Sequence, residues 1–164
     1  MSTAGTLQIT AQGDRELVIT RRFDAPCTLV FAAMTKPELV KRWLGVFGGW
    51  SLAVCEIDLR VGGAYRYEWH GPKGARMGMR GVTREVTPPA RWVATGRFDE
   101  AWYPGEEINT SVLVEQRGQT TLTNTVRYES QEARDMVLKS PMEKGMAAGY
   151  DNLEKVLATM AQEG

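Results

Sequence analysis

The sequence predicts an α+β fold in which a curved antiparallel sheet wraps around a long C-terminal helix. Three features predict it: a strand pattern followed by two short helical patterns, then an alternating stretch cut by turn residues, then a long amphipathic pattern. The connections between the central strands are too short for a parallel crossover, which favours antiparallel pairing. A flat two-layer sandwich is the alternative. Residues 1–14 are expected to form a flexible N-terminal arm, and residues 15–164 a single domain.

The first elements are a strand and two short helices. Residues 16–23 (ELVITRRF) are rich in β-branched side chains and predict a strand. Asp24-Ala25-Pro26 ends this strand and starts a short helix, because proline is well suited to a first helical turn. Thr35-Lys36-Pro37-Glu38 has the sequence of a capping box and predicts a second short helix that ends near Gly45.

The central part of the chain alternates with a period of two, which predicts strands. Glycine and proline turns divide it into a six-stranded antiparallel meander. The strands are expected at about 52–60, 64–70, 77–86, 92–98, 110–116 and 120–128. In the second of them, alternation places Tyr65, Tyr67 and Trp69 on one face, which makes the core side of the sheet unusually aromatic.

The C-terminal part returns to helical periodicity. Ser130 is expected to cap a short helix that runs through Lys139, and Ser140-Pro141-Met142-Glu143 is a second capping-box sequence. The final helix is expected to be the longest element. Its apolar stripe consists of Met146, Tyr150, Leu153, Leu157 and Met160. Such a stripe requires a partner surface, which the sheet would provide.

Composition and charge narrow the classes of function. The chain has 20 Lys and Arg against 20 Asp and Glu, so no net field attracts nucleic acid or an anionic membrane. It has no apolar run long enough to span a bilayer and no signal-peptide pattern, so a cytoplasmic location is expected. Cys27 and Cys55 are expected to be buried thiols, and His70, the single histidine, an exposed residue beside a turn. We therefore expect no metal and no cofactor.

Several short motifs occur in an order that resembles a known superfamily. They are Arg22-Phe23-Asp24-Ala25-Pro26, Trp43, Asp58-Leu59-Arg60-Val61-Gly62-Gly63, Ser130-Gln131-Glu132-Ala133-Arg134-Asp135 and Met142-Glu143-Lys144-Gly145-Met146. The chain resembles the SRPBCC (START/Bet v 1-like) superfamily, and within it the branch named after the activator of heat-shock-protein-ninety ATPase. The resemblance covers about residues 16–160. It implies a helix-grip fold with an elongated hydrophobic cavity between the sheet and the last helix, but it does not imply one activity.

The first functional hypothesis is the binding of a small lipophilic or aromatic ligand in that cavity. The candidate binding residues are Trp43, Trp50, Tyr65, Tyr67, Trp69, Met79, Phe98, Asn124, Met146, Gly149, Tyr150 and Leu153. Asn124 falls on an apolar face, where its amide needs a side chain, a water or a ligand as partner. Gly145 and Gly149 either allow close helix packing or keep a ligand space open. The aromatic and acidic loop 99–109 is a candidate lid, with ordinary loop packing as the alternative.

Two other classes of function stay open. A cyclase-like or dehydratase-like enzyme needs an acid or base inside the cavity, and the sequence shows no convincing catalytic constellation. Arg80 or Arg84 would point inward only if a bulge near Gly81 reversed the register. A chaperone-associated interaction module is the third hypothesis, although in the named activator this domain is one part of a larger protein, and this chain has no room for the other part. Homodimerisation is also compatible with the sequence.

Overall fold

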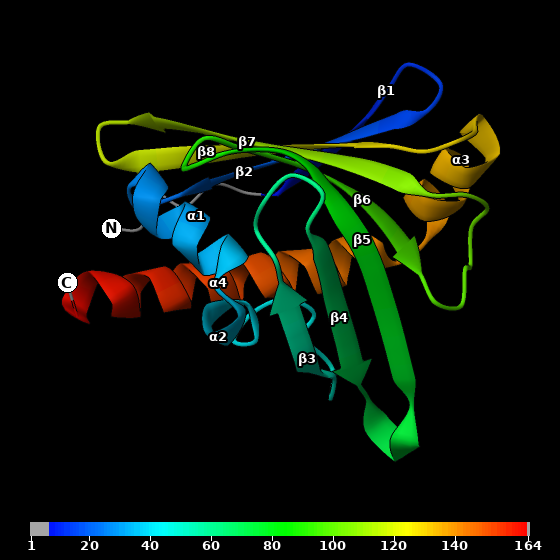
Figure 1. Ribbon diagram of the computed structural model, residues 1–164, viewed down its shortest axis with the longest axis horizontal. Coiled ribbons are helices and arrows are strands. Elements are labelled where there is room, and N and C mark those ends of the chain that lie inside the picture. The colour runs from blue at the N-terminus through cyan, green and yellow to red at the C-terminus, as the bar shows by residue number, and fades with distance from the viewer. Residues whose placement is uncertain (1–6, 164) are drawn as a thin grey trace.

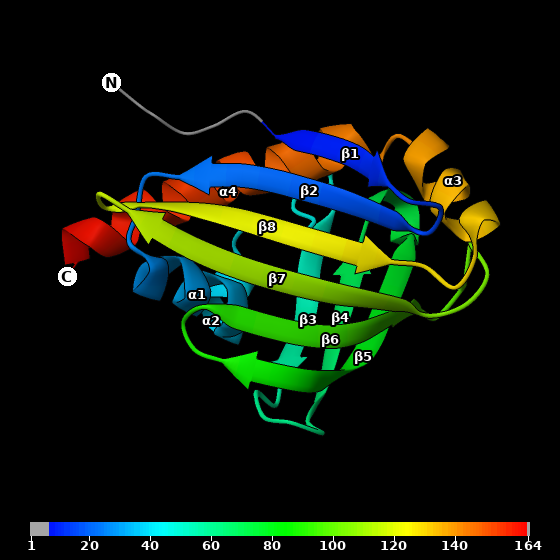
Figure 2. The same ribbon diagram turned by 90° about the horizontal axis from the view of Figure 1, so that it is seen from above.

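A computed structural model describes residues 7–163 of the chain. In this part, one antiparallel sheet has the strand order β1-β2-β8-β7-β6-β5-β4-β3. The sheet is strongly curved, and the helix α4 (Met142–Glu163) lies across its concave side (Figures 1 and 2). The α+β prediction is thus confirmed, and the flat sandwich is excluded.

The N-terminal arm is the first correction to the sequence analysis. Residues 8–12 form the strand β1 (Gln8–Gln12), which pairs with β2 (Glu16–Phe23) from Gln8 opposite Thr20 to Gln12 opposite Glu16. Most side chains of β1 are exposed, so backbone pairing at the sheet edge rather than burial places this strand. The remainder of the expected arm, residues 1–6, lies outside the described residues.

Two short helices follow β2 as predicted, at one end of the sheet (Figure 2). They are α1 (Cys27–Thr35) and α2 (Pro37–Val40). The predicted capping box does not form, because the Thr35 hydroxyl donates to the Phe31 carbonyl oxygen at 2.7 Å within α1. The chain then turns, and the indole Nε1 of Trp43 donates to the Ala33 carbonyl oxygen at 2.9 Å. This bond fixes the turn after α2 against α1.

The predicted six-stranded meander is confirmed, with neighbouring strands joined in chain order. Its strands are β3 (Ser51–Ile57), β4 (Ala64–His70), β5 (Arg76–Thr87), β6 (Arg91–Phe98), β7 (Glu107–Gln116) and β8 (Gln119–Arg127), with a 3-10 turn η1 (Pro72–Gly74) between β4 and β5. β7 begins at residue 107, earlier than predicted. Register shifts interrupt the β3–β4 and β5–β6 pairings, and such irregularities increase local bending. The strands β3–β5 therefore stand steeply against the remainder of the sheet (Figure 1).

The C-terminal helices close the fold. The helix α3 (Gln131–Lys139) begins as predicted, since the Ser130 hydroxyl accepts a hydrogen bond from the backbone N–H of Ala133 at 3.1 Å. The second predicted capping box does not form in this way. The Ser140 hydroxyl instead donates to the Val137 carbonyl oxygen at 2.6 Å, at the end of α3.

Buried side chains form two clusters on the concave side of the sheet. The larger joins β2, β8 and α1 to the C-terminal half of α4, and includes Phe23, Leu122 and Leu153. The smaller lies under β3–β5 and includes Leu52 and Tyr67. Both cysteines are free and buried, as predicted. The candidate site lies between these two clusters.

Candidate functional site

A cavity of about 500 Å³ opens between the concave face of the sheet, the N-terminal half of α4 and the turn after α2. Its lining combines members of both buried clusters with half-buried aromatic and methionine side chains. Phe47, Met77 and Trp102 also line it and are partly exposed, so they mark its edge toward solvent. This volume suits a small organic molecule.

Most of the residues predicted for the site lie on the cavity wall. They are Trp43, Trp50, Tyr65, Tyr67, Trp69, Met79, Phe98, Asn124, Met146 and Tyr150. Gly149 and Leu153 do not line it. Leu153 is 0% exposed and belongs to the packed core. A Cβ atom at Gly149 would lie 3.4 Å from the Trp43 carbonyl oxygen, which is an ordinary contact distance, at the place where α4 packs on the turn after α2.

Gly145, rather than Gly149, is the small residue that faces the cavity. A Cβ atom built there meets only the ring edge of Phe47, at 3.9 Å. Close packing does not require glycine at either position: a Cβ atom would fit at ordinary contact distance at Gly149, and Gly145 faces open space.

The strand β4 supplies an aromatic wall. Tyr65, Tyr67 and Trp69 alternate onto the concave face and line the cavity, as the sequence predicted. The ring centroids of Tyr65 and Tyr67 are 4.9 Å apart, and those of Tyr67 and Trp69 are 5.7 Å apart. The indole Nε1 of Trp69 donates to the Leu44 carbonyl oxygen at 3.0 Å. Burial raises the pKa of Tyr67 well above its ordinary value, so this wall is uncharged.

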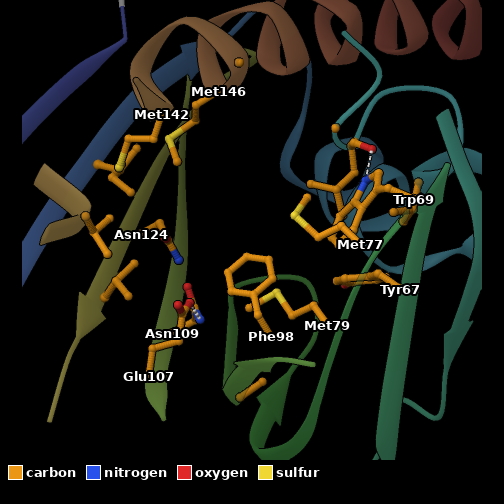
Figure 3. Close-up of a pocket in the computed structure, with 18 of the residues that line it drawn as sticks. Tyr67, Trp69, Met77, Met79, Phe98, Glu107, Asn109, Asn124, Met142 and Met146 are labelled. Atoms are coloured by element: carbon orange, nitrogen blue, oxygen red, sulfur yellow. Dashed lines mark hydrogen bonds between the residues drawn. The ribbon is translucent and has the colours of Figure 1, made fainter. Parts of the chain in front are cut away.

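Methionines from α4 and β5 complete the apolar surface. In Figure 3, Met142 and Met146 lie on α4 at one side of the cavity, and Met77 lies near Trp69 at the other. Phe98 of β6 and Met79 lie between them. Thioethers are flexible and polarisable, so such a surface adapts to ligands of different shape.

Opposite the aromatic wall, the strands β7 and β8 carry a polar strip. Glu107, Asn109 and Ser111 alternate along β7 and line the cavity, and Asn124 of β8 is paired with Ser111. The amide Nδ2 of Asn124 donates to the Ser111 hydroxyl at 3.0 Å, which supplies the side-chain partner that the sequence analysis required. The amide Nδ2 of Asn109 donates to Glu107 Oε2 at 2.5 Å. Figure 3 shows Glu107, Asn109 and Asn124 on the side of the cavity away from Tyr67 and Trp69.

Glu107 is the buried carboxyl group of this strip. Its side chain is 7% exposed, and the Tyr103 hydroxyl donates to its Oε1 atom. Burial raises the pKa of Glu107 above its ordinary value. Burial and the negative charge of Glu107 also raise the pKa values of Tyr103 and Tyr128, so both phenols stay protonated. Among the described residues that line the cavity, none is Lys, Arg or His.

Glu107 is absent from the predicted site residues, because its sequence position falls in the expected acidic loop 99–109. The alternation that runs back from buried Leu113 through Ser111 and Asn109 reaches Glu107, so a longer strand would have placed it correctly. Trp102 and Tyr103 of the same loop do line the cavity. Their ring centroids are 4.8 Å apart, and Tyr103 also contacts Phe98 at 6.0 Å, so the loop forms part of the cavity wall.

The arginines considered as inward-pointing lie outside the cavity. Arg80 and Arg84 are exposed, and the register shift in β5 occurs at Thr83–Glu85 rather than at Gly81. Asp99 accepts hydrogen bonds from Arg66 at 2.6 Å and from Arg80 at 2.8 Å. These two guanidinium groups lower the pKa of Asp99. The ionic network therefore belongs to the outer face of the sheet.

Two kinds of feature are absent from residues 7–163. No group of three or more His, Cys, Asp and Glu side chains in this range is arranged to hold a metal ion. None of the helices there is long and apolar enough to cross a membrane.

The curved sheet, the long helix across it and the cavity between them define a helix-grip protein. Residues 24–158 match the family described as activator of Hsp90 ATPase homolog 1-like protein. The chain belongs to this family, as the resemblance in the sequence predicted.

Solved structures show the same fold. A crystal structure of a protein from Rhodobacter sphaeroides is 34% identical, covers 94% of this chain and 99% of its own, and superposes with a TM-score of 0.88. A protein from Mycobacterium smegmatis is 24% identical over 92% of this chain and 95% of its own, with a TM-score of 0.80. An AHSA1-like protein from Aeromonas hydrophila is 18% identical over 88% of this chain and 94% of its own, with a TM-score of 0.65. No curated protein sequence matches the chain.

Proposed function

We propose that the protein binds a small lipophilic or aromatic molecule in the cavity between the sheet and α4. The observation that carries this proposal is a cavity of about 500 Å³ whose walls are mainly aromatic rings and methionine side chains. Pockets with an apolar lining and a few convergent polar groups are typical of small-molecule sites.

Gly145 gives independent support. A glycine inside a helix costs about 1 kcal/mol relative to alanine. At this position no close backbone contact requires glycine, since a Cβ atom would meet only Phe47 at 3.9 Å. A preserved ligand space explains the residue better than packing does.

An enzymatic role on a hydrophobic substrate is the second candidate, because Glu107 supplies a buried carboxyl in the cavity that the sequence analysis lacked. A buried carboxyl with a raised pKa is suited to proton transfer. Chemical conversion of a bound ligand, followed by mass spectrometry, would distinguish this role from binding alone.

The test of the binding proposal is a thermal-shift screen with neutral flavonoids, sterols and polyketide-like aromatics, together with fatty acids. A ligand at 100 times its Kd adds about 2.7 kcal/mol of stability, which raises Tm measurably. Gly145→Leu should place a side chain in the cavity and remove the shift. Gly149→Ala is the matched control, because Gly149 lies on the same helix but away from the cavity.

Two results would contradict the proposal. One is the absence of any shift across the panel, extended by lipophilic amines, after removal of copurified molecules by denaturation and refolding. The other is a shift that Gly145→Leu leaves unchanged. Circular dichroism of both glycine variants checks that the fold is retained.

A further inference from the structure

Glu107 has no positively charged partner on the cavity wall. The described residues that line the cavity include no Lys, Arg or His, and Glu107 is 7% exposed. The neighbouring Glu106 lines a separate hollow together with Arg66, Arg80 and Arg97. These arginines therefore lie outside the cavity that Glu107 lines. A buried carboxylate without a counter-ion is costly, and a cation that arrives with the ligand would offset that cost.

Seven side chains of the wall already donate hydrogen bonds within the protein. The side chains of Trp43, Trp69, Trp92, Tyr65, Tyr103, Asn109 and Asn124 each donate to a protein oxygen. Each oxygen of Glu107 accepts one such bond, from Tyr103 or from Asn109, and a carboxylate oxygen can accept a further one. Glu107 therefore offers a ligand a carboxyl acceptor on a wall whose other polar side chains are neutral amides, hydroxyls and indoles.

Aromatic rings lie near the same carboxyl group, since the Tyr103 hydroxyl donates to it. The ring centroid of Tyr103 lies 5.5 Å from that of Tyr128 and 6.0 Å from that of Phe98. In Figure 3 the carboxyl of Glu107 points toward the part of the cavity between Phe98 and Asn124. Ring faces attract cations electrostatically, and they do so more strongly where water is excluded.

We infer that the ligand of this cavity is a lipophilic amine, whose ammonium group donates to Glu107 while its apolar part lies against the aromatic and methionine wall. This inference rests on the proposed binding function and specifies its ligand class. An anionic ligand such as a fatty acid would place a second negative charge beside Glu107 with no cation on the wall to compensate.

The test is a head-group series on one aromatic skeleton, measured by isothermal titration calorimetry at pH 7.5. The probes are 2-naphthylmethylamine, 2-naphthalenemethanol and 2-naphthoate. We expect the amine to bind most tightly and the carboxylate most weakly, with about a tenfold or greater difference in Kd between them, as a charge-assisted hydrogen bond implies. Glu107→Gln should weaken amine binding by a similar factor and leave the alcohol nearly unchanged. Glu106→Gln, which removes the same charge on the neighbouring residue, should preserve the order.

The pH dependence provides a second readout. Amine binding should weaken as pH falls through the pKa of Glu107, because the protonated carboxyl loses its negative charge. The titratable groups that face Glu107 are Tyr103, Tyr65 of β4 and Tyr128 after β8, and their raised pKa values keep them neutral throughout. Binding of the alcohol should show no comparable change.

Equal affinities for the three probes, or equal effects of the Glu106 and Glu107 substitutions on the amine, would overturn the ligand class while leaving the binding function intact. Failure of both the probes and the neutral screen would instead remove the binding function itself. The wild-type series alone decides the charge preference, so the test stands even where Glu107→Gln fails to fold.

Discussion

The apolar face of α4 packs into the core in the C-terminal half of the helix and lines the cavity in the N-terminal half. In the C-terminal half, Leu153 and Leu157 are 0% and 1% exposed and pack into the core. In the N-terminal half, Gly145 and Met146 are half-buried and line the cavity. Helical periodicity thus identifies the face of α4 that meets the sheet. The size and shape of the side chains on that face decide whether they pack into the core or leave a cavity.

The largest expected effect lies in the filled half. Leu153→Ala should lower the free energy of unfolding by about 2–5 kcal/mol, because it removes buried methyl groups and leaves a void in packed surroundings. Met146→Ala is the matched substitution in the open half and should cost clearly less, because its side chain already borders empty space. Urea unfolding of both variants measures the difference. Equal losses would show that the two halves are packed alike.

The next prediction concerns pH and the polar strip. The folded-state pKa of Glu107 is raised by burial, so its contribution to stability is complete below the unfolded value of about 4.3 and is lost as pH rises through the folded pKa. Without ligand, wild-type protein should therefore lose stability relative to Glu107→Gln as pH rises through this window. Denaturant unfolding at a series of pH values gives the difference curve. A flat curve would contradict a raised pKa.

The smallest expected effect is at the boundary between the two halves. Gly149→Ala should stabilise the protein by up to about 1 kcal/mol, since alanine favours the helix and its Cβ would lie at an ordinary 3.4 Å from the Trp43 carbonyl oxygen. Ligand-induced Tm shifts should be unchanged. A destabilised variant would mean that the contact between α4 and the turn after α2 does not accommodate an added methyl group.

Local pattern predicted the arrangement of strands and the aromatic wall well. Strand alternation placed Tyr65, Tyr67 and Trp69 on one face, and the structure has them there. This succeeds because the period of a strand fixes which side chains share a face. The strand β1 was missed, because its sequence QITAQ is mostly polar and its place depends on backbone pairing with β2.

The polar strip was predicted only in part. Asn124 was found because an amide interrupts an apolar alternation, whereas Glu107 was assigned to a loop. The start of β7 is set by its pairing with β6, where Glu107 lies opposite Gly96. The two glycines of α4 show the same limit: the sequence cannot distinguish helix packing from open space, and the neighbours of each residue show that Gly145 and not Gly149 faces the cavity.

The tryptophans of this chain give the cavity an optical consequence. The sequence contains five, and all five, Trp43, Trp50, Trp69, Trp92 and Trp102, line the same space. Indole emission shifts to shorter wavelength and changes in yield when water around the ring is replaced by apolar groups. The tryptophan fluorescence of the whole protein therefore reports on this cavity. Without any added label, the emission spectrum indicates whether the cavity contains water or a ligand.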